Sequence, residues 1–254
     1  MKIKKIFENE NVLVLDKSAG IIVHGDGKEL KDQSQKKTET VSDYILKNFK
    51  YIKGVGENLG DIEKPGIVHR LDKDTTGTLL IAKNQEAYEN LKHQFQTHKI
   101  KKEYVALVWG YMKHETGIVD HAIARSKNDF RKKEVVKVTS FDHGKFRGEE
   151  RAALTRYKVL KRFSIFGEKV TLVTFFPETG RTHQIRIHSK SIGHPIVGDH
   201  LYGKTNLKFE KAFFGKSKIR QLLHAKSISF FNPTSGELIK VESLIPKDFI
   251  PAFK

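Results

Sequence analysis

The chain has 254 residues, of which 38% are hydrophobic and 30% charged, a composition that indicates a globular protein with one large domain or two small ones. No apolar run approaches the ~20 residues that span a bilayer, and the N-terminus lacks the apolar core of a secretion signal, so we expect neither membrane association nor export. The chain has no cysteine, which excludes disulfides and thiolate metal sites, and we expect a cytoplasmic location.

The net charge is strongly positive. Lys and Arg number 47 against 30 Asp and Glu, which gives a formal net charge of +17. An excess of this size favours a polyanionic partner, because phosphates that lysine and arginine neutralise release their counterions. A lysine-rich overall composition explains the same excess without any partner. Of the two explanations, we expect binding to nucleic acid.

The N-terminal part of the chain alternates short apolar runs with polar segments. Residues 11–16 and 21–24 are predicted to be buried strands. His24, at the end of the second run, is expected to be structural. Segment 25–38 is polar and is predicted to be a loop, and a helix is predicted over 41–49, where apolar residues recur at helical spacing. Residues after this helix, up to the central motif, are again predicted to form a loop.

The stretch 66–77 carries the densest chemistry of the chain. Asp72 lies in a short polar loop between an apolar pair and the strand-like run 78–82, and Arg70 comes two residues before it. A tight turn against a strand can present a reactive carboxylate to solvent. An Asp beside Thr and Gly also commonly just caps its own turn. The residues of this loop alone leave both roles open for Asp72.

The middle of the chain is predicted to hold an amphipathic helix over 85–98 and a strand over 101–110. Tyr104 lies in this strand, and its position alone assigns it to the core. The mostly basic stretch 125–150 has few apolar residues and is predicted to be an exposed excursion with one strand-like piece at 135–138. It is either a solvated loop or a contact surface for an RNA backbone.

The C-terminal part contains three histidines that could suggest a metal site. His183, His188 and His194 are spaced by five and six residues, and residues five apart do not share a helix face. No acidic residue accompanies them at the spacing of zinc enzymes, so we expect no metal. No glycine-rich phosphate-binding loop occurs, so we expect no nucleotide cofactor. The predicted elements here are strands at 152–161 and 169–176, a turn at 177–180, a helix opening within 181–188 and a closing hairpin within 222–237.

Four blocks of the sequence together resemble the RluA-type pseudouridine synthases. The string Val68-His-Arg-Leu-Asp-Lys-Asp-Thr-Thr-Gly77 matches the signature around that family's catalytic aspartate, with Thr76 where serine is usual. The other three blocks are segment 17–24, with Ser18 where proline is usual, the strand from Lys102 to Gly110, and the intact stretch 179–203. The blocks occur in the family's order and cover nearly the whole chain.

The resemblance implies an α+β pseudouridine-synthase fold, with a large mixed, mainly antiparallel sheet and a central active-site cleft flanked by helices and loops. Many larger relatives carry a small N-terminal RNA-binding domain of the S4 type. The family motifs begin close to the N-terminus here, so we expect one catalytic domain over residues 1–254 without an S4 domain. The resemblance implies no cofactor, because uridine is isomerised without oxidation or transfer of an external group.

The resemblance also implies the roles of three residues. Asp72 becomes the catalytic residue, either as a nucleophile at C1′ or as a base at C2′ of the uridine. Arg186 becomes the cation that keeps this carboxylate ionised inside the cleft. Tyr104 becomes the ring that stacks on the uracil and accepts a proton when the new bond forms.

Further residues of the same motifs are expected to contact RNA. Arg70 is expected to enter the space left by the flipped uridine, and Ile185 to pack on the base. The remaining predicted RNA-binding residues are His69, Arg181, Thr182 and His183. We expect a monomer that acts on rRNA, first on the 23S rRNA of the large subunit, and second on tRNA. The alternative is a non-catalytic RNA-binding or RNA-folding protein that retains the cleft.

Overall fold

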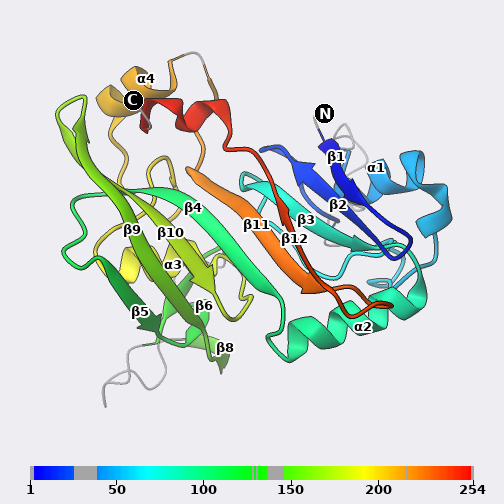
Figure 1. Cartoon of the computed structure of the whole chain (residues 1–254). Coiled ribbons are helices and arrows are strands. Elements are labelled where there is room, and N and C mark those ends of the chain that lie inside the picture. Colours follow the sequence, from blue (N-terminus) through cyan, green and yellow to red (C-terminus); the bar gives the residue numbers. More distant parts are fainter. Residues whose placement is uncertain are drawn as a thin grey trace. The chain divides into compact units, whose positions relative to one another are not determined.

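Strands and helices of the chain assemble into two units, which are described separately (Figure 1). The computed structural model describes residues 3–25, 39–127, 129, 131–136, 146–215 and 217–252. Unit 1 comprises Met1–Lys101 and Ala225–Leu244, and unit 2 comprises Lys102–His224 and Ile245–Lys254. The predicted α+β class, with mainly antiparallel strand pairing, is confirmed.

Unit 1 is built on strands that pair in the order β1, β2, β3 and β11, with β12 on β11. The pairs β1–β2, β2–β3 and β11–β12 are antiparallel. Two helices and one 3-10 turn accompany them. The elements are β1 (Ile3–Glu8), β2 (Val12–Lys17), α1 (Val41–Asn48), a 3-10 turn (Lys50–Ile52), β3 (Thr76–Ala82), α2 (Gln85–Gln96), β11 (Leu223–Phe231) and β12 (Leu238–Glu242).

The core of unit 1 lies between its strands and α2. Residues 12–15 of β2 and all of β3 are buried, as the continuous apolar runs of these two strands predict for strands covered on both faces. Ala87 and Leu91 of α2 pack on this sheet. They share one face of the helix because they lie four residues apart. The predicted helix over 85–98 is therefore confirmed and ends two residues earlier.

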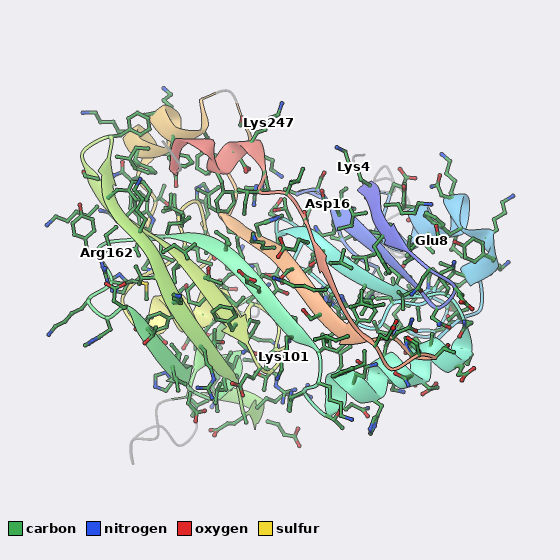
Figure 2. All side chains as sticks on the ribbon, in the orientation of Figure 1. Lys4, Glu8, Asp16, Lys101, Arg162 and Lys247 are labelled. Atoms are coloured by element: carbon green, nitrogen blue, oxygen red, sulfur yellow. The ribbon has the colours of Figure 1, made fainter. Side chains whose placement is uncertain are left out.

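Charged residues dominate β1, and polar contacts fix it to the rest of unit 1. Glu8, at the end of the strand (Figure 2), accepts hydrogen bonds from Lys5 and from the hydroxyl of Tyr51, both at 2.7 Å, and pairs with Lys83 at 2.9 Å. These bonds, with that from Lys5 contributing most, lower the pKa of Glu8 to about 2. The strand β1 was not predicted, because its apolar residues Ile3, Ile6 and Phe7 do not alternate with its charged residues.

Unit 2 contains two antiparallel sheets. In the larger one, β4 pairs with β10, β10 with β9 and β9 with β5, whereas β6 pairs with both β7 and β8 in the smaller one. The strands are β4 (Lys101–Trp109), β5 (Thr116–Asp120), β6 (Ile123–Ser126), β7 (Lys133–Val135), β8 (Phe146–Arg151), β9 (Leu154–Ile165) and β10 (Glu168–Pro177). The helices are α3 (Gln184–Ser191), α4 (Leu207–Phe214) and a C-terminal 3-10 helix (Lys247–Ala252).

The strand β4 divides the core of unit 2 into two clusters, because successive side chains of a strand point to opposite faces. Val105, Leu107 and Trp109 pack with the phenylalanines of α4. Ala106 and Val108 pack on the other face in a cluster that contains Ile185 of α3 and the ring of Tyr104. The predicted strands 101–110, 152–161 and 169–176 are confirmed as β4, β9 and β10.

The predicted strand at 21–24 is wrong. These residues belong to no strand, although Ile21 and Val23 are buried as their apolar character predicts. The carbonyl oxygens of Ile22 and Val23 instead accept hydrogen bonds from the amides of Val41 and Ser42, each at 3.0 Å. These amides open α1 and lack partners inside the helix. The run 21–24 therefore caps α1, and the helix predicted over 41–49 is confirmed. Of the loop predicted at 25–38, residues 26–38 lie outside the described residues.

The basic excursion at 125–150 is more structured than predicted. It contains β7 and β8, which pair with β6. β7 ends at Val135, so it shares only this residue with the strand-like piece predicted at 135–138, and residues 137 and 138 lie outside the described part. The helix α4 and the strand β5 were also not predicted. Across the described ranges, no helix is both long and apolar enough to cross a membrane.

Candidate active site

The loop that carries Asp72 is held at both ends in unit 1. Before the loop, the amide of Ala82 donates to the carbonyl oxygen of Gly66 at 2.8 Å, so the entry of the loop lies beside the end of β3. Within the loop, the amide of Thr75 donates to the carbonyl oxygen of Asp72 at 3.1 Å and closes a turn. The side chain of Asp72 is half-buried, and that of Arg70 is exposed. The loop thus presents both side chains from a defined backbone.

Gly77 fixes the other end of the loop. Its φ of +112° lies in the region that favours glycine, and a Cβ at this position would lie 2.1 Å from the carbonyl oxygen of Ala225 on β11. No larger residue fits without moving the backbone of one of the two strands. The chain passes from the Asp72 loop into β3 at this contact, so the loop ends at a fixed distance from β11.

Lys17 ties the Asp72 loop to the end of β2. Its side chain is fully buried, and its ammonium donates to the carbonyl oxygens of Ile21 at 2.9 Å, Lys73 at 3.0 Å and Ser18 at 3.1 Å. The amide of Gly20 donates to the same Lys73 oxygen at 2.9 Å. A buried ammonium requires such partners, because burial without them is costly. Lys73 follows Asp72 directly, so Lys17 holds the backbone beside the candidate catalytic residue.

His69 has a structural contact that the sequence analysis did not anticipate. Its Nε2 accepts a hydrogen bond from the amide of Leu80 at 2.9 Å, and its ring lies 5.0 Å from that of Phe95 on α2. An Nε2 that accepts places the ring proton on Nδ1. The ring therefore attaches the loop to β3 and α2. The predicted contact of His69 with RNA stays a prediction.

Tyr104 and Ile185 lie together in unit 2. Tyr104 projects from β4 opposite Phe175 of β10, and both rings belong to the cluster that contains Ile185. The side chain of Tyr104 is half-buried, whereas Ile185 is buried. Tyr104 can therefore be both a core residue and a ring that stacks on uracil, because the ring packs on the core and keeps part of its surface open.

Lys102 lies on the same face of β4 as Tyr104, two residues earlier. Its ammonium donates to the carbonyl oxygen of Thr179 at 3.1 Å, in the turn between β10 and α3. Burial lowers the pKa of Lys102 to about 8, because the charged form loses hydration. The sequence analysis quoted Lys102 only as part of a motif and assigned it no role.

A buried glutamine organises the turn that carries the predicted RNA-binding residues. The side-chain oxygen of Gln184 accepts from the hydroxyl of Thr179 at 2.7 Å and from the amide of Arg181 at 2.9 Å. Its side-chain nitrogen donates to the carbonyl oxygen of Leu154 at 3.0 Å and to the hydroxyl of Thr155 at 2.9 Å. All hydrogen-bonding positions of the amide are used, so the turn is fixed to β9.

This turn carries three residues that were predicted to bind RNA, of which Arg181 and His183 are half-buried. Thr182 is exposed, and the guanidinium of Arg181 donates through Nε to the carbonyl oxygen of Ala152 at 3.0 Å. His183 has a φ of +59°, which is uncommon outside glycine and is tolerated at functional sites where neighbouring contacts enforce it. Contact between these side chains and RNA stays a prediction.

Arg186 is held by Asp199, a partner that the sequence analysis did not assign. Its Nε donates to one oxygen of Asp199 at 2.7 Å and its Nη2 to the other at 2.9 Å, and both side chains are buried. The two hydrogen bonds form a charge-assisted, bidentate pair, which fixes the plane of the guanidinium. Asp72 belongs to unit 1 and Arg186 to unit 2, and their pairing stays a prediction.

The carboxylate of Asp199 also shapes its own turn. One of its oxygens accepts from the amides of Leu201 at 3.0 Å and Tyr202 at 3.1 Å. Gly198 precedes it with a φ of +74°, and a Cβ there would lie 2.1 Å from the carbonyl oxygen of Arg220. Gly198 and Asp199 belong to the stretch 179–203 that resembles the family, which was the sequence signal for this region.

The three histidines considered as metal ligands make separate hydrogen bonds. His188 is buried and contacts the hydroxyl of Thr155 and the carbonyl oxygen of His121, and His194 contacts the carbonyl oxygen of Trp109 at 2.8 Å. Burial lowers the pKa of His188, which keeps its imidazole neutral. The described residues contain no group of three or more histidine, cysteine, aspartate or glutamate side chains arranged to hold a metal ion.

Comparison with solved structures defines the class of fold. Two human proteins, RNA Pseudouridylate Synthase Domain Containing 1 and 4, superpose on this chain with a TM-score of 0.71 each. The first is 24% identical and is matched over 100% of this chain and 86% of its own, and the second is 23% identical and is matched over 98% and 91%. The chain thus has the fold of the pseudouridylate synthases.

Sequence comparison defines the family. A family profile described as RNA pseudouridylate synthase matches residues 11–191. An uncharacterised RNA pseudouridine synthase of Aquifex aeolicus is 37% identical over 244 residues, which cover 96% of this chain and 70% of the relative. The ribosomal large subunit pseudouridine synthase D of Nitrosomonas europaea is 36% identical over 97% of this chain and 63% of the relative. The chain belongs to the RNA pseudouridylate synthase family and is an isomerase that acts on uridines in RNA.

Proposed function

We propose that the chain converts specific uridines of structured RNA, first of all in the 23S rRNA of the large ribosomal subunit, to pseudouridine, with Asp72 as the catalytic residue. The observation that carries the proposal is the family signature 68–77, placed on a loop whose backbone is held by Lys17 and by the close approach of Gly77 to β11. A catalytic carboxylate needs such a fixed backbone, because small displacements from the reactive geometry cost large factors in rate.

The reaction breaks the bond from C1′ of the ribose to N1 of the uracil and forms a bond from C1′ to C5. The proton on C5 leaves, and N1 gains one, so the product is an isomer of the substrate. Asp72 takes part either as a nucleophile at C1′ or as a base at C2′. In this proposal Arg186 holds the carboxylate ionised, and Tyr104 contacts the uracil and accepts the C5 proton.

The arrangement within unit 2 supports these roles. Asp199 binds the guanidinium of Arg186 through two hydrogen bonds, which restrict the plane of that cation. Tyr104 and Ile185 belong to one cluster, so an uracil that stacks on the ring would also lie close to Ile185. Lys102 connects the strand of Tyr104 to the turn that leads to α3.

Large-subunit rRNA is proposed as the substrate because relatives from Nitrosomonas europaea, Zymomonas mobilis and Pseudomonas aeruginosa carry the name ribosomal large subunit pseudouridine synthase D. The net charge of +17 fits an RNA partner. Transfer RNA is the second candidate substrate. We also propose that residues 1–254 act as one catalytic domain, as a monomer and in the cytoplasm.

The proposal is tested by mapping pseudouridine in total RNA from cells that lack this protein and carry either the wild-type chain or Asp72→Asn. We expect one or a few sites to disappear in the deletion strain and to return only with the wild-type chain, and the RNA that carries them names the substrate. Sites that persist in the deletion strain, or that Asp72→Asn restores equally well, would favour the non-catalytic RNA-binding alternative.

A further inference from the structure

Tyr202 connects the basic excursion of unit 2 to Arg186. Its side chain is only 4% exposed, and its hydroxyl accepts a hydrogen bond from the amide of Lys133, the first residue of β7, at 3.0 Å. The guanidinium carbon of Arg186 lies 5.0 Å from the centre of the Tyr202 ring. The hydroxyl of Tyr202 therefore contacts the excursion, and the face of the Tyr202 ring contacts the candidate catalytic arginine.

The hydroxyl of Tyr202 has a second partner. It lies 2.9 Å from Nδ1 of His183, and the two rings meet edge to face with centroids 5.5 Å apart. A phenol has one proton to donate, so a hydroxyl that accepts from Lys133 can still donate to His183. This arrangement places the ring proton of His183 on Nε2, and it fixes a residue that was predicted to bind RNA.

Tyr202 and Arg186 are linked a second time through Asp199. The backbone amide of Tyr202 donates to Asp199, whose two oxygens bind Arg186. The Tyr202 ring contacts the face of the guanidinium, whereas Asp199 binds the edge of the guanidinium. A displacement of the ring therefore acts on this face. Planar cations over an aromatic ring are stabilised by about 0.5–2 kcal/mol, so the orientation of Arg186 responds to the position of the ring.

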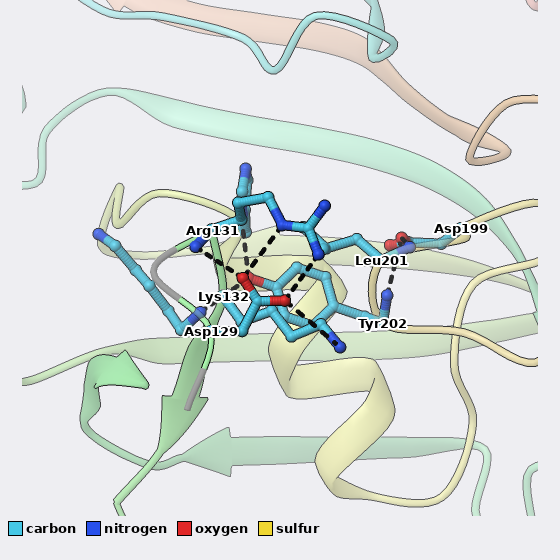
Figure 3. Close-up of polar contacts among 8 residues, drawn as sticks. Asp129, Arg131, Lys132, Asp199, Leu201 and Tyr202 are labelled. Atoms are coloured by element: carbon cyan, nitrogen blue, oxygen red, sulfur yellow. Dashed lines mark hydrogen bonds and ion pairs between the residues drawn. The ribbon is translucent and has the colours of Figure 1, made fainter. Parts of the chain in front are cut away.

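The other side of Tyr202 faces the small sheet. Ile123 of β6 and Val135 of β7 pack in one cluster with Tyr202 and with Ile187 of α3. Figure 3 shows the turn between these strands close to the turn that carries Asp199 and Tyr202. Movement of β7 is thus transmitted to Tyr202 both through the amide of Lys133 and through this apolar cluster.

The turn before β7 carries cations that suit an RNA backbone. Arg131 has 67% of its side chain exposed and Lys132 has 36%. Asp129 holds the guanidinium of Arg131 through Nε at 3.1 Å and Nη2 at 3.0 Å, which gives the exposed cation a defined position. Phosphate groups are bound by such cations. Because Nε and Nη2 of Arg131 already bind Asp129, a phosphate would be held by the remaining N–H groups of this guanidinium and by Lys132.

We propose that Tyr202 is a positioning residue that couples RNA binding at the turn of Arg131 and Lys132 to the orientation of Arg186. The proposal rests on the proposed function, in which Arg186 acts on the catalytic carboxylate. RNA that engages the turn holds β7 in place, the amide of Lys133 holds the hydroxyl of Tyr202, and the ring holds the guanidinium. Turnover is then fastest on RNAs that contact the excursion as well as the site.

The first test is Tyr202→Phe, which keeps the ring and removes the hydroxyl. With unmodified 23S rRNA transcribed in vitro as substrate, we expect kcat to fall by about tenfold, the size expected for a lost hydrogen bond, with little change in KM. The melting temperature should fall by only a few degrees, because packing of the ring is retained while the amide of Lys133 and Nδ1 of His183 each lose one partner. Tyr111→Phe, the same change at an exposed tyrosine of unit 2, is the matched control and should leave kcat unchanged. Equal kcat for Tyr202→Phe and wild type would overturn the proposal.

The second test measures the coupling. In the wild-type background, the double variant Arg131→Ala and Lys132→Ala should raise KM and also lower kcat. In the Tyr202→Phe background, it should raise KM and leave kcat where Tyr202→Phe alone has put it. Effects on kcat that multiply would show that the turn and Tyr202 act independently, which a purely structural tyrosine predicts.

Asp72→Asn in the same assay separates this proposal from the one it rests on. Loss of turnover in Asp72→Asn together with multiplying kcat effects would refute the coupling alone. Full turnover in Asp72→Asn would refute the proposed function, and the coupling would fall with it.

Discussion

The contact between Lys17 and the Asp72 loop leads to a quantitative prediction for Lys17→Met. Methionine fills nearly the same volume but removes the three hydrogen bonds to the carbonyl oxygens of Ser18, Ile21 and Lys73. A hydrogen bond from a charged donor contributes about 1.5–3 kcal/mol, and a buried carbonyl left without its donor costs about 1–3 kcal/mol. Removal of the desolvated charge offsets part of this loss. We expect the free energy of unfolding to fall by about 3–5 kcal/mol.

Urea unfolding followed by circular dichroism measures this change. The matched control is Lys4→Met, which makes the same substitution at an exposed lysine of the neighbouring strand β1 (Figure 2) and should alter stability by no more than about 0.5 kcal/mol. We also expect Lys17→Met to lower kcat in the fraction that remains folded, because the backbone after Asp72 loses its anchor. Equal stability of the two variants would refute the reasoning that the ammonium holds this loop.

Three further predictions follow from exposure and pKa. Arg70→Ala should reduce turnover on folded RNA more than on an unstructured oligonucleotide of the same sequence, and equal losses would argue against a role in base flipping. The pKa of Lys102 is about 8 against 10.5 for an ordinary lysine, so stability should rise between pH 8 and 10.5, because the unfolded chain binds more protons there. Lys102→Met should remove this rise in the urea midpoint. Burial lowers the pKa of His188, so stability should fall as the pH drops below about 6.5, and the urea midpoint of His188→Asn should depend less on pH in that range.

The sequence predicted the elements that carry strong hydrophobic patterns. The apolar runs of β2 and β3 and the alternation along β4 correctly indicated buried strands. The run 21–24 has the same composition as a strand, but its carbonyl oxygens cap α1 instead of joining a sheet. The apolar composition of a run predicts that its side chains are buried. Whether the run pairs with another strand depends on which hydrogen-bond donors lie near its carbonyl oxygens. The strand β1 shows the converse, since it pairs with β2 although half of its residues are charged. It lies at the end of the strand order, where a strand forms without a continuous apolar run.

The motifs located the loops of the candidate site but not the residues that hold them. The string 68–77 identified the Asp72 loop, and the block 179–203 identified the region of Arg186. Gln184 and Asp199 stand inside the block 179–203, and Lys17 opens the block 17–24, yet nothing in their spacing indicates which groups they bind. Their partners lie up to 56 residues away in the sequence, as between Lys17 and Lys73, and only the fold brings them together.

Each unit thus uses a buried charged side chain to fix part of its candidate site. In unit 1 the ammonium of Lys17 gathers three carbonyl oxygens beside Asp72, and in unit 2 the carboxylate of Asp199 gathers two amides and the guanidinium of Arg186. Substitution of such a group leaves several buried partners unsatisfied at once, so its effect on stability is large and cooperative. A loop held in this way can keep its reactive side chain oriented without packing it into the core. The reactive carboxylate can then stay half-buried and accessible to RNA while its backbone is as well fixed as that of a strand.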